Sequence, residues 1–188
     1  MEVEIDLIER KQKNKSTTSA LRRSGQIPCV IYSKGQIGET FSIPKVAFEE
    51  VVRRLEMGFL STTIFNLKTA AGKKRRAIVR EIQYKPTTYE VSHIDFLELI
   101  PDHKIEMKVP LTCLGEADCV GVKAGGYLRR VKESITIRCL PKDIPTHFEV
   151  DISDVDIRQA KTVADLKSVP KGIDIRLPQN QVIATVMK

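Results

Sequence analysis

A short stretch of the chain, residues 10–32, gathers six basic side chains and a row of hydroxyls and contains no acidic residue. Lysines and arginines in this number can neutralise neighbouring phosphates together and release their counterions. Serine and threonine hydroxyls supply hydrogen bonds to phosphate or sugar oxygens. The stretch therefore indicates that the protein binds a polyanion. Its cations are Arg10, Lys11, Lys13, Lys15, Arg22 and Arg23, and its hydroxyls are Ser16, Thr17, Thr18 and Ser19.

A second group of cations without acids follows between residues 68 and 80. The first 98 residues hold 17 basic and 12 acidic side chains, whereas the remaining residues hold 14 and 12. The formal net charge of +7 therefore belongs mainly to the first half. A solvated surface would explain one such cluster, but two of them in the more basic half favour an anionic partner. The second cluster comprises Lys68, Lys73, Lys74, Arg75, Arg76 and Arg80.

Four further polar side chains, Tyr32, Gln83, His93 and Asp95, suit hydrogen bonding rather than charge neutralisation. In an extended strand, His93 and Asp95 lie on the same face. They can then present a donor and an acceptor to a nucleic-acid backbone or a ribose 2′-hydroxyl. The pair also resembles half of a catalytic dyad. No activated serine or cysteine can be matched to it from the sequence, so we predict a protein that is not an enzyme.

The four cysteines raise the question of a zinc site together with His103 or His147. Their spacing matches no zinc finger or ribbon, so we expect buried thiols, no metal and no cofactor. A glycine-rich segment, residues 121–126, lacks the Gly-Lys-Ser/Thr ending of a phosphate loop and is expected to be a turn between strands. The cysteines are Cys29, Cys113, Cys119 and Cys139.

Composition limits the class of protein further. With 188 residues, 41% of them hydrophobic, the chain can bury one large core or two modest ones. The absence of tryptophan and an aromatic content of 5% argue against a single-strand binder built on stacking platforms. The N-terminus lacks the basic and apolar segments of a signal peptide, and no apolar run approaches the roughly 20 residues of a membrane span. We therefore expect a protein of the reducing cytoplasm that contacts no membrane.

The elements that must position these residues can be read from hydrophobic periodicity. A short helix through Arg23 is expected to begin after a cap at Ser16 or Thr17 and to end at Gly25. A longer helix is predicted between Pro44 and residue 58. Together with the strands, these helices indicate a small α+β barrel or sheet. The strand candidates are residues 3–9, 29–32, 40–43, 61–67, 77–83 and 89–97.

The second half of the chain is predicted to be mostly β, after a boundary near residues 101–104. Thr162 and Asp165 fit a capping box for one helical turn. Prolines punctuate the strands, a pattern typical of a sandwich or barrel. We therefore expect a mainly β protein with a few helices, divided into domains 1–98 and 99–188. The strand candidates here are residues 105–114, 127–131, 134–140, 147–152, 173–177 and 182–187.

Several short motifs occur in a specific order along the chain. They are Lys15 with Leu21-Arg22-Arg23, Gly25, Ile27-Pro28, Val30 and Tyr32, then Gln83 with Pro86, Ser92-His93-Ile94-Asp95-Phe96, Val109-Pro110-Leu111, residues 121–128 and Val150-Asp151-Ile152-Ser153. Together they resemble the bacterial large-subunit ribosomal protein L25 family, in its long two-domain form also called the general stress protein CTC. The resemblance covers essentially the whole chain.

This resemblance implies an N-terminal six-stranded β-barrel that binds 5S rRNA and a β-rich C-terminal domain. The implied function is that of a structural constituent of the large ribosomal subunit in the cytoplasm. Neighbouring large-subunit proteins are further expected partners, and the free protein is expected to be a monomer. Carried over by position, the RNA-binding residues are Arg10, Lys15, Thr18, Arg22, Tyr32, Gln83, His93 and Asp95.

The chain departs from the family pattern at four positions. The family usually has glycines at the positions of Asn14 and Ser16, commonly arginine at Ser19, and glycine at Ser33. Because the change at Ser19 removes one charge-assisted contact, an alternative function stays open. In it, the chain is a stress-related interaction protein with weak or lost rRNA binding that acts through its C-terminal β domain. A third hypothesis is a hydrolase built on His93 and Asp95.

Overall fold

A computed structural model of the chain describes two compact units, Met1–His103 and Lys104–Lys188. Two of the predicted cations, Lys11 and Lys13, lie outside the described residues. The residues that the structure describes are 2–10, 14–33, 38–56, 58–70, 72–167, 169–170 and 172–188.

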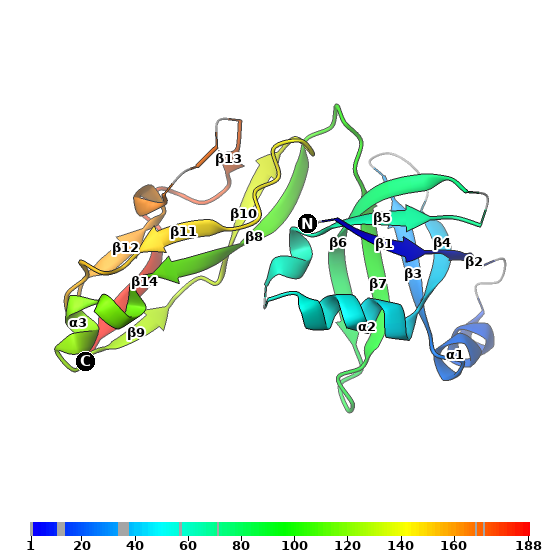
Figure 1. The fold of residues 1–188 in the computed structure, drawn as a ribbon, viewed down its shortest axis with the longest axis horizontal. Helices are drawn as coiled ribbons and strands as arrows, with labels where there is room; N and C mark the ends of the chain where they lie inside the picture. Colours follow the sequence, from blue (N-terminus) through cyan, green and yellow to red (C-terminus); the bar gives the residue numbers. More distant parts are fainter. Residues whose placement is uncertain are drawn as a thin grey trace. The chain divides into compact units, whose positions relative to one another are not determined.

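The first unit is a closed β-barrel (Figure 1). Its strands follow the order β1-β5-β6-β7-β3-β4-β2. Strands β1 and β2, at the two ends of this order, are halves of one segment that bends at Leu7. Since β1 pairs with β5 at one edge and β2 pairs with β4 at the other, this segment closes the sheet. The strands are β1 (Glu2–Asp6), β2 (Ile8–Glu9), β3 (Gln26–Tyr32), β4 (Glu39–Pro44), β5 (Ile64–Lys68), β6 (Lys74–Tyr84) and β7 (Val91–Glu98). The prediction of a mainly β protein with an N-terminal β-barrel is confirmed.

Alternating apolar residues fill the barrel, as a period of two requires. In β3, Ile27, Cys29 and Ile31 are buried, and in β7 so are Ile94 and Phe96. Residues between them in these strands therefore face outward. Full burial of each large side chain contributes about 1.5–3 kcal/mol to folding.

Three phenylalanines connect helix α2 (Lys45–Arg54) to the barrel core. The rings of Phe48 and Phe65 stack with centroids 6.3 Å apart, and Phe65 meets Phe96 edge-on at 5.6 Å. All three side chains are fully buried. The helix is therefore part of the core, and the single turn η1 (Phe59–Ser61) follows it.

Helix α1 (Lys15–Arg23), by contrast, buries none of its residues. It begins after Asn14, whose carbonyl accepts hydrogen bonds from the Thr17 and Thr18 hydroxyls, so the predicted cap at Ser16 or Thr17 is wrong. Gly25 has a φ of +75°, the left-handed conformation expected after the helix. The helix thus lies on the barrel surface with its polar side chains available.

The second unit contains two small sheets, with strand orders β11-β8-β10-β13 and β12-β14-β9. The Asp165 carboxylate accepts hydrogen bonds from the backbone and hydroxyl of Thr162, where a capped turn is expected. The prediction of a β-rich second half is confirmed. Its elements are β8 (Ile105–Leu114), η2 (Glu116–Asp118), α3 (Val120–Lys123), β9 (Tyr127–Arg130), β10 (Ser134–Cys139), β11 (Phe148–Asp151), β12 (Ala160–Thr162), η3 (Val163–Asp165), β13 (Asp174–Ile175) and β14 (Val182–Met187).

The glycine-rich segment of this unit is not only a turn, as predicted, because it includes the one-turn helix α3. A Cβ atom at Gly121 would lie 2.9 Å from the backbone of Asp156 and of Ile157. Glycine at this position therefore allows the helical turn to pack directly against a neighbouring loop. Nothing in this packing requires a phosphate ligand.

The barrel core generates a stability prediction. Phe65→Ala removes a fully buried ring that contacts Phe48 and Phe96. We expect it to lower the free energy of unfolding of the barrel by about 3–5 kcal/mol. Hydrogen exchange of the β5, β6 and β7 amides in the full chain measures this change. In the control, Val46→Ala on α2, the side chain is 67% exposed and the change should stay within about 0.5 kcal/mol. Equal effects of the two variants would contradict the packing described.

Candidate nucleic-acid interface

Four of the predicted site residues lie on one outward face of the barrel, formed by β6, β7 and β3. Gln83 in β6 pairs with His93 in β7, and Asp95 lies beside Val30 in β3. Tyr32 lies further along β3, opposite Leu97. The structure therefore brings together Tyr32, Gln83, His93 and Asp95, which are separated by up to 63 positions in the sequence.

His93 and Asp95 are in contact on this face. The imidazole Nδ1 lies 2.8 Å from a carboxylate oxygen of Asp95, and the side chains are 22% and 30% exposed. Despite this short distance, Nδ1 makes no hydrogen bond within the described part of the chain. Ser92, the neighbour of His93, donates its hydroxyl to the Gln83 carbonyl and not to this pair.

Tyr32 keeps its phenolic proton on this face. Partial burial raises its pKa, Asp95 and Glu81 raise it further, and Arg80 opposes them. A protonated phenol can donate a hydrogen bond to an acceptor on a ligand. The β6–β7 register shifts between Val79 and Glu81, which places a bulge at Arg80 beside the site.

Two carboxylates oppose each other across the strands of this face. Glu81 pairs with Asp95 in the β6–β7 register. Like charges in this position repel each other and would also repel a phosphate. They instead favour donors such as a base amino group or a ribose hydroxyl. Our sequence reasoning missed Glu81, although the period of two from Gln83 would have placed it on this face.

Arg22 ties helix α1 to the edge of this face, and Arg10 contacts the helix from the segment that precedes it. Arg22 Nε donates a hydrogen bond of 3.0 Å to the Ser92 carbonyl, next to His93 in β7. Arg10 Nη2 donates one of 3.1 Å to the Thr18 hydroxyl. The Arg10 Nε is buried and has no hydrogen-bond partner within the described part of the chain. All eight predicted residues therefore lie on α1, directly before it, or on the adjoining face.

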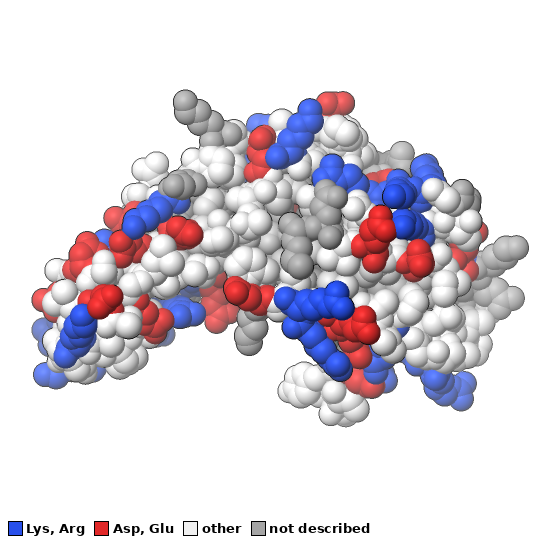
Figure 2. All heavy atoms as spheres, in the orientation of Figure 1, with Lys and Arg blue, Asp and Glu red and all other residues white. Residues whose placement is uncertain are grey.

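The cations at α1 lack acidic partners. The helix contains no acidic residue, and no described carboxylate lies within 4 Å of Arg10, Lys15, Arg22 or Arg23. Figure 2 shows basic atoms without acidic neighbours at the position of α1, whereas basic and acidic atoms lie side by side over α2. The positive charge at α1 is therefore available to an anion.

Three of the six cations in the second basic cluster contact acids distant in sequence. Lys68 and Lys74 both pair with Glu4 in the neighbouring strand β1. Arg75 pairs with Glu39 at 2.7 Å, and its hydrogen bond to that carboxylate raises the pKa of the guanidinium. Lys68 correspondingly lowers the pKa of Glu4. A cluster that lacks acids in the sequence thus becomes a set of ion pairs on the folded surface.

Three of the four thiols are small core residues, whereas Cys113 is only half-buried, contrary to the expectation that all are buried. Burial raises the pKa of Cys29 to about 12 and that of Cys139 to about 11. Cys119 is buried and donates a hydrogen bond to the Val155 carbonyl. No set of three potential metal ligands comes together in the part of the chain that the structure describes.

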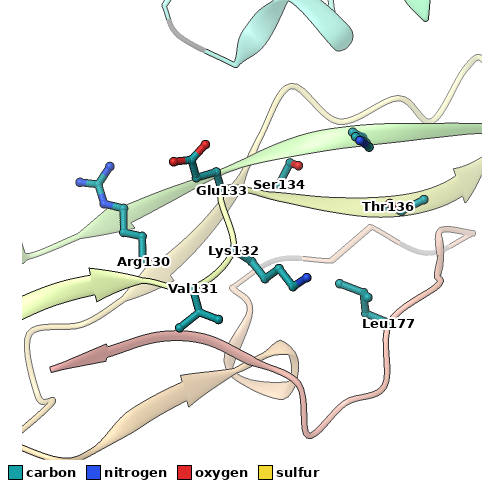
Figure 3. Close-up of a pocket in the computed structure, with 8 residues that line it drawn as sticks. Arg130, Val131, Lys132, Glu133, Ser134, Thr136 and Leu177 are labelled. Carbon is teal, nitrogen blue, oxygen red and sulfur yellow. The ribbon is translucent and has the colours of Figure 1, made fainter. Parts of the chain in front are cut away.

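A hollow of about 410 Å³ opens beside β8 and β10 in the second unit. Figure 3 shows Lys132 directed toward Leu177 and Glu133 pointing the other way. Arg130, another lining residue, is engaged by Glu116 at 2.8 Å. The lining also includes Lys108, Val131, Ser134 and Thr136 and contains neither a thiol nor an imidazole.

Comparison with known proteins divides the chain in the same way as the structure. Residues 5–96 match the family model described as the Ribosomal L25p family, and residues 104–188 match that of ribosomal protein TL5, C-terminal domain. "Large ribosomal subunit protein bL25" of Chlamydia pneumoniae is 36% identical over 186 residues, covering 99% of this chain and 100% of the relative. The proteins of the same name from Chlamydia abortus and Chlamydia trachomatis serovar L2 are 37% and 35% identical, with the same coverage. Within the described residues, no helix has the length and apolar character needed to cross a membrane.

The burial of the thiols generates a prediction about their reactivity. At pH 8, Cys29 and Cys139 should stay protonated and unmodified by dithionitrobenzoate in the folded protein, because their pKa values lie at about 12 and about 11. In guanidinium chloride all four thiols should react. Mass spectrometry of the labelled peptides identifies the modified positions. Rapid labelling of Cys29 in the folded protein would show that this thiol is accessible and activated.

Proposed function

The chain belongs to the bacterial ribosomal L25 family, and from this membership we propose that its N-terminal unit binds 5S rRNA as a structural constituent of the large ribosomal subunit. The relatives that cover the whole chain are named as proteins of that subunit. We accordingly place the protein on the ribosome in the cytoplasm. In this function the protein performs no catalysis and stabilises an RNA structure by binding it.

One observation carries the proposal: the cations of α1 have no acidic partners and lie beside the outward face that holds the other predicted residues. Lys15 and Arg23 are exposed, and Arg22 is tied to β7 by its hydrogen bond to the Ser92 carbonyl. This bond uses Nε and leaves the outer guanidinium nitrogens for a phosphate. The remaining cations with short carboxylate contacts contribute less to the attraction of an anion.

The two parts of the interface would contact different chemical groups of the RNA. Cations at α1 neutralise phosphates and fix the register of the RNA helix. The face with Tyr32, Gln83, His93 and Asp95 then meets the shallow minor groove, where an RNA duplex presents 2′-hydroxyls and base edges. Since Asp95 accepts hydrogen bonds and Tyr32 donates one, this face can distinguish donors from acceptors. A DNA duplex would lack the ribose 2′-hydroxyls from which the Asp95 carboxylate could accept hydrogen bonds.

The departures from the family pattern motivate the alternative function, in which rRNA binding is weak or lost. Asn14 precedes α1, and its carbonyl accepts hydrogen bonds from the Thr17 and Thr18 hydroxyls. Ser16 and Ser19 are exposed on the helix. These residues keep the helix intact but supply no charge. Arg23, also exposed on α1, is placed to offset the cation missing at Ser19.

Loss of one α1 cation should weaken binding and its dependence on salt. We expect Lys15→Ala to reduce affinity for 5S rRNA and to lower the slope of log K against log salt concentration by about 1, because one phosphate contact is lost. Arg22→Ala should cost about 1–3 kcal/mol. Filter binding at several salt concentrations measures both. Arg53→Ala removes the same charge from α2, where Glu49 and Glu50 balance it, and serves as control. An affinity equal to wild type for both α1 variants would exclude α1 from the interface.

Sedimentation separates the two functions in the cell. If the protein is a constituent of the large subunit, the native protein should sediment with large subunits and be released by high salt, because its contacts are mainly ionic. The alternative function leaves it at the top of the gradient with free proteins. The Lys15→Ala Arg22→Ala double variant provides the control and should shift toward the free fraction.

A further inference from the structure

The tip of the β6–β7 hairpin presents two exposed tyrosines. Tyr89 is 80% exposed and Tyr84 is 52% exposed. Tyr89 also has a φ of +53°, in the left-handed region that bulky residues rarely adopt. This conformation is strained for a residue with a side chain. A large ring is therefore held in water at a backbone position that would suit glycine better.

The turn that carries Tyr89 is well fixed. Its amide donates to the Lys85 carbonyl, and the Lys85 amide donates to the Glu90 carbonyl, both at 2.9 Å. The Glu90 carboxylate contacts Lys45 at 2.6 Å and Lys85 at 2.8 Å and accepts a hydrogen bond from the Thr88 hydroxyl. These cations lower the pKa of Glu90 to about 2, so the network stays ionised near neutral pH. The backbone around Tyr89 is thus held in one arrangement.

The hairpin tip continues the interface described above. The tip connects β6 and β7, the strands that carry Gln83 and His93, and the register between these strands shifts between Gln83 and Tyr84. Ser92, next to His93, supplies the carbonyl that Arg22 contacts. Figure 1 shows the hairpin tip and α1 projecting from the same end of the barrel. A ligand that contacts the α1 cations and His93 can therefore extend to the tip.

We propose that Tyr89 stacks on an unpaired nucleobase of the RNA that the barrel binds. This inference rests on the proposed function, because it places Tyr89 at the end of the same interface. An aromatic ring presented to solvent on a fixed turn forms a stacking platform for any base. The low aromatic content of the chain argues against a row of such platforms, and a single contact at the end of a duplex-binding face is consistent with it.

The nearby charges favour a nucleobase over an apolar surface of a protein. The tip follows a face with hydroxyl, imidazole and carboxylate groups, and its own neighbours are Lys85, Thr87 and Thr88. An apolar protein partner would have to bury the ion pair of Lys85 with Glu90. A nucleobase, in contrast, can stack on the Tyr89 ring while this ion pair stays in water.

Substitution of Tyr89 by glycine separates the functional effect from the structural one. Tyr89→Gly relieves the strained φ, so thermal unfolding of the full chain should occur at the same temperature or higher. Loss of the stacking contact should nevertheless weaken 5S rRNA binding about 5- to 150-fold. The salt dependence should stay that of wild type, because no charge is removed. Tyr127→Ala, which removes a 56% exposed tyrosine from the other unit, is the matched control and should bind like wild type.

Tyr89→Trp supplies a direct readout, since the chain has no other tryptophan. Its affinity should remain near wild type, and its fluorescence should be quenched at saturating 5S rRNA by contact with a base. The inference would be overturned if Tyr89→Gly bound with wild-type affinity, or if the emission of Tyr89→Trp did not change on RNA binding. In either case, weaker binding by Lys15→Ala would show that the proposed function still holds. If the wild-type chain does not bind 5S rRNA, both this inference and the proposed function fail.

Discussion

The structure depends on the closure of the first sheet by one bent segment. At Leu7 the chain leaves β1, where it pairs with β5, and enters β2, where it pairs with β4. The Leu7 amide donates to the Lys68 carbonyl at 2.7 Å, so the bend itself stays hydrogen-bonded. One segment thus pairs with both ends of the sheet, and the apolar faces of the strands are enclosed. The pairing of β7 with both β6 and β3 creates the polar outward face.

Closure of the barrel also decides which cations remain available. Glu4 on β1 comes next to Lys68 and Lys74 only because β1 pairs with β5, and Glu39 reaches Arg75 across the folded unit. Helix α1 has no such neighbour, since it lies outside the barrel and contains no acid. The net charge of the unit is therefore less informative than its distribution. The attraction for an anion is concentrated at the helix that Arg22 ties to β7.

The interface combines groups that attract phosphate with groups that repel it. Cations at α1 attract phosphate, whereas Glu81 and Asp95 on the adjoining face repel it and accept hydrogen bonds from donors. An RNA duplex offers both kinds of group in a fixed geometry, with phosphates at the edges of the minor groove and hydroxyls within it. The rigid hairpin extends this face by an aromatic surface at Tyr89. Shape and charge together thus define the partner more narrowly than either does alone.

The sequence by itself determined the mainly β fold, the family and the pattern of strands, because the alternation of residues such as Ile27, Cys29 and Ile31 is a local property of the chain. Motif order likewise identified the predicted interface residues. Only the tertiary structure decided that Lys68 and Lys74 share the Glu4 carboxylate, that Glu81 lies opposite Asp95, and that Tyr89 adopts a positive φ. These features depend on strand pairing between distant segments and on the ion pairs of Glu90, which no local pattern records.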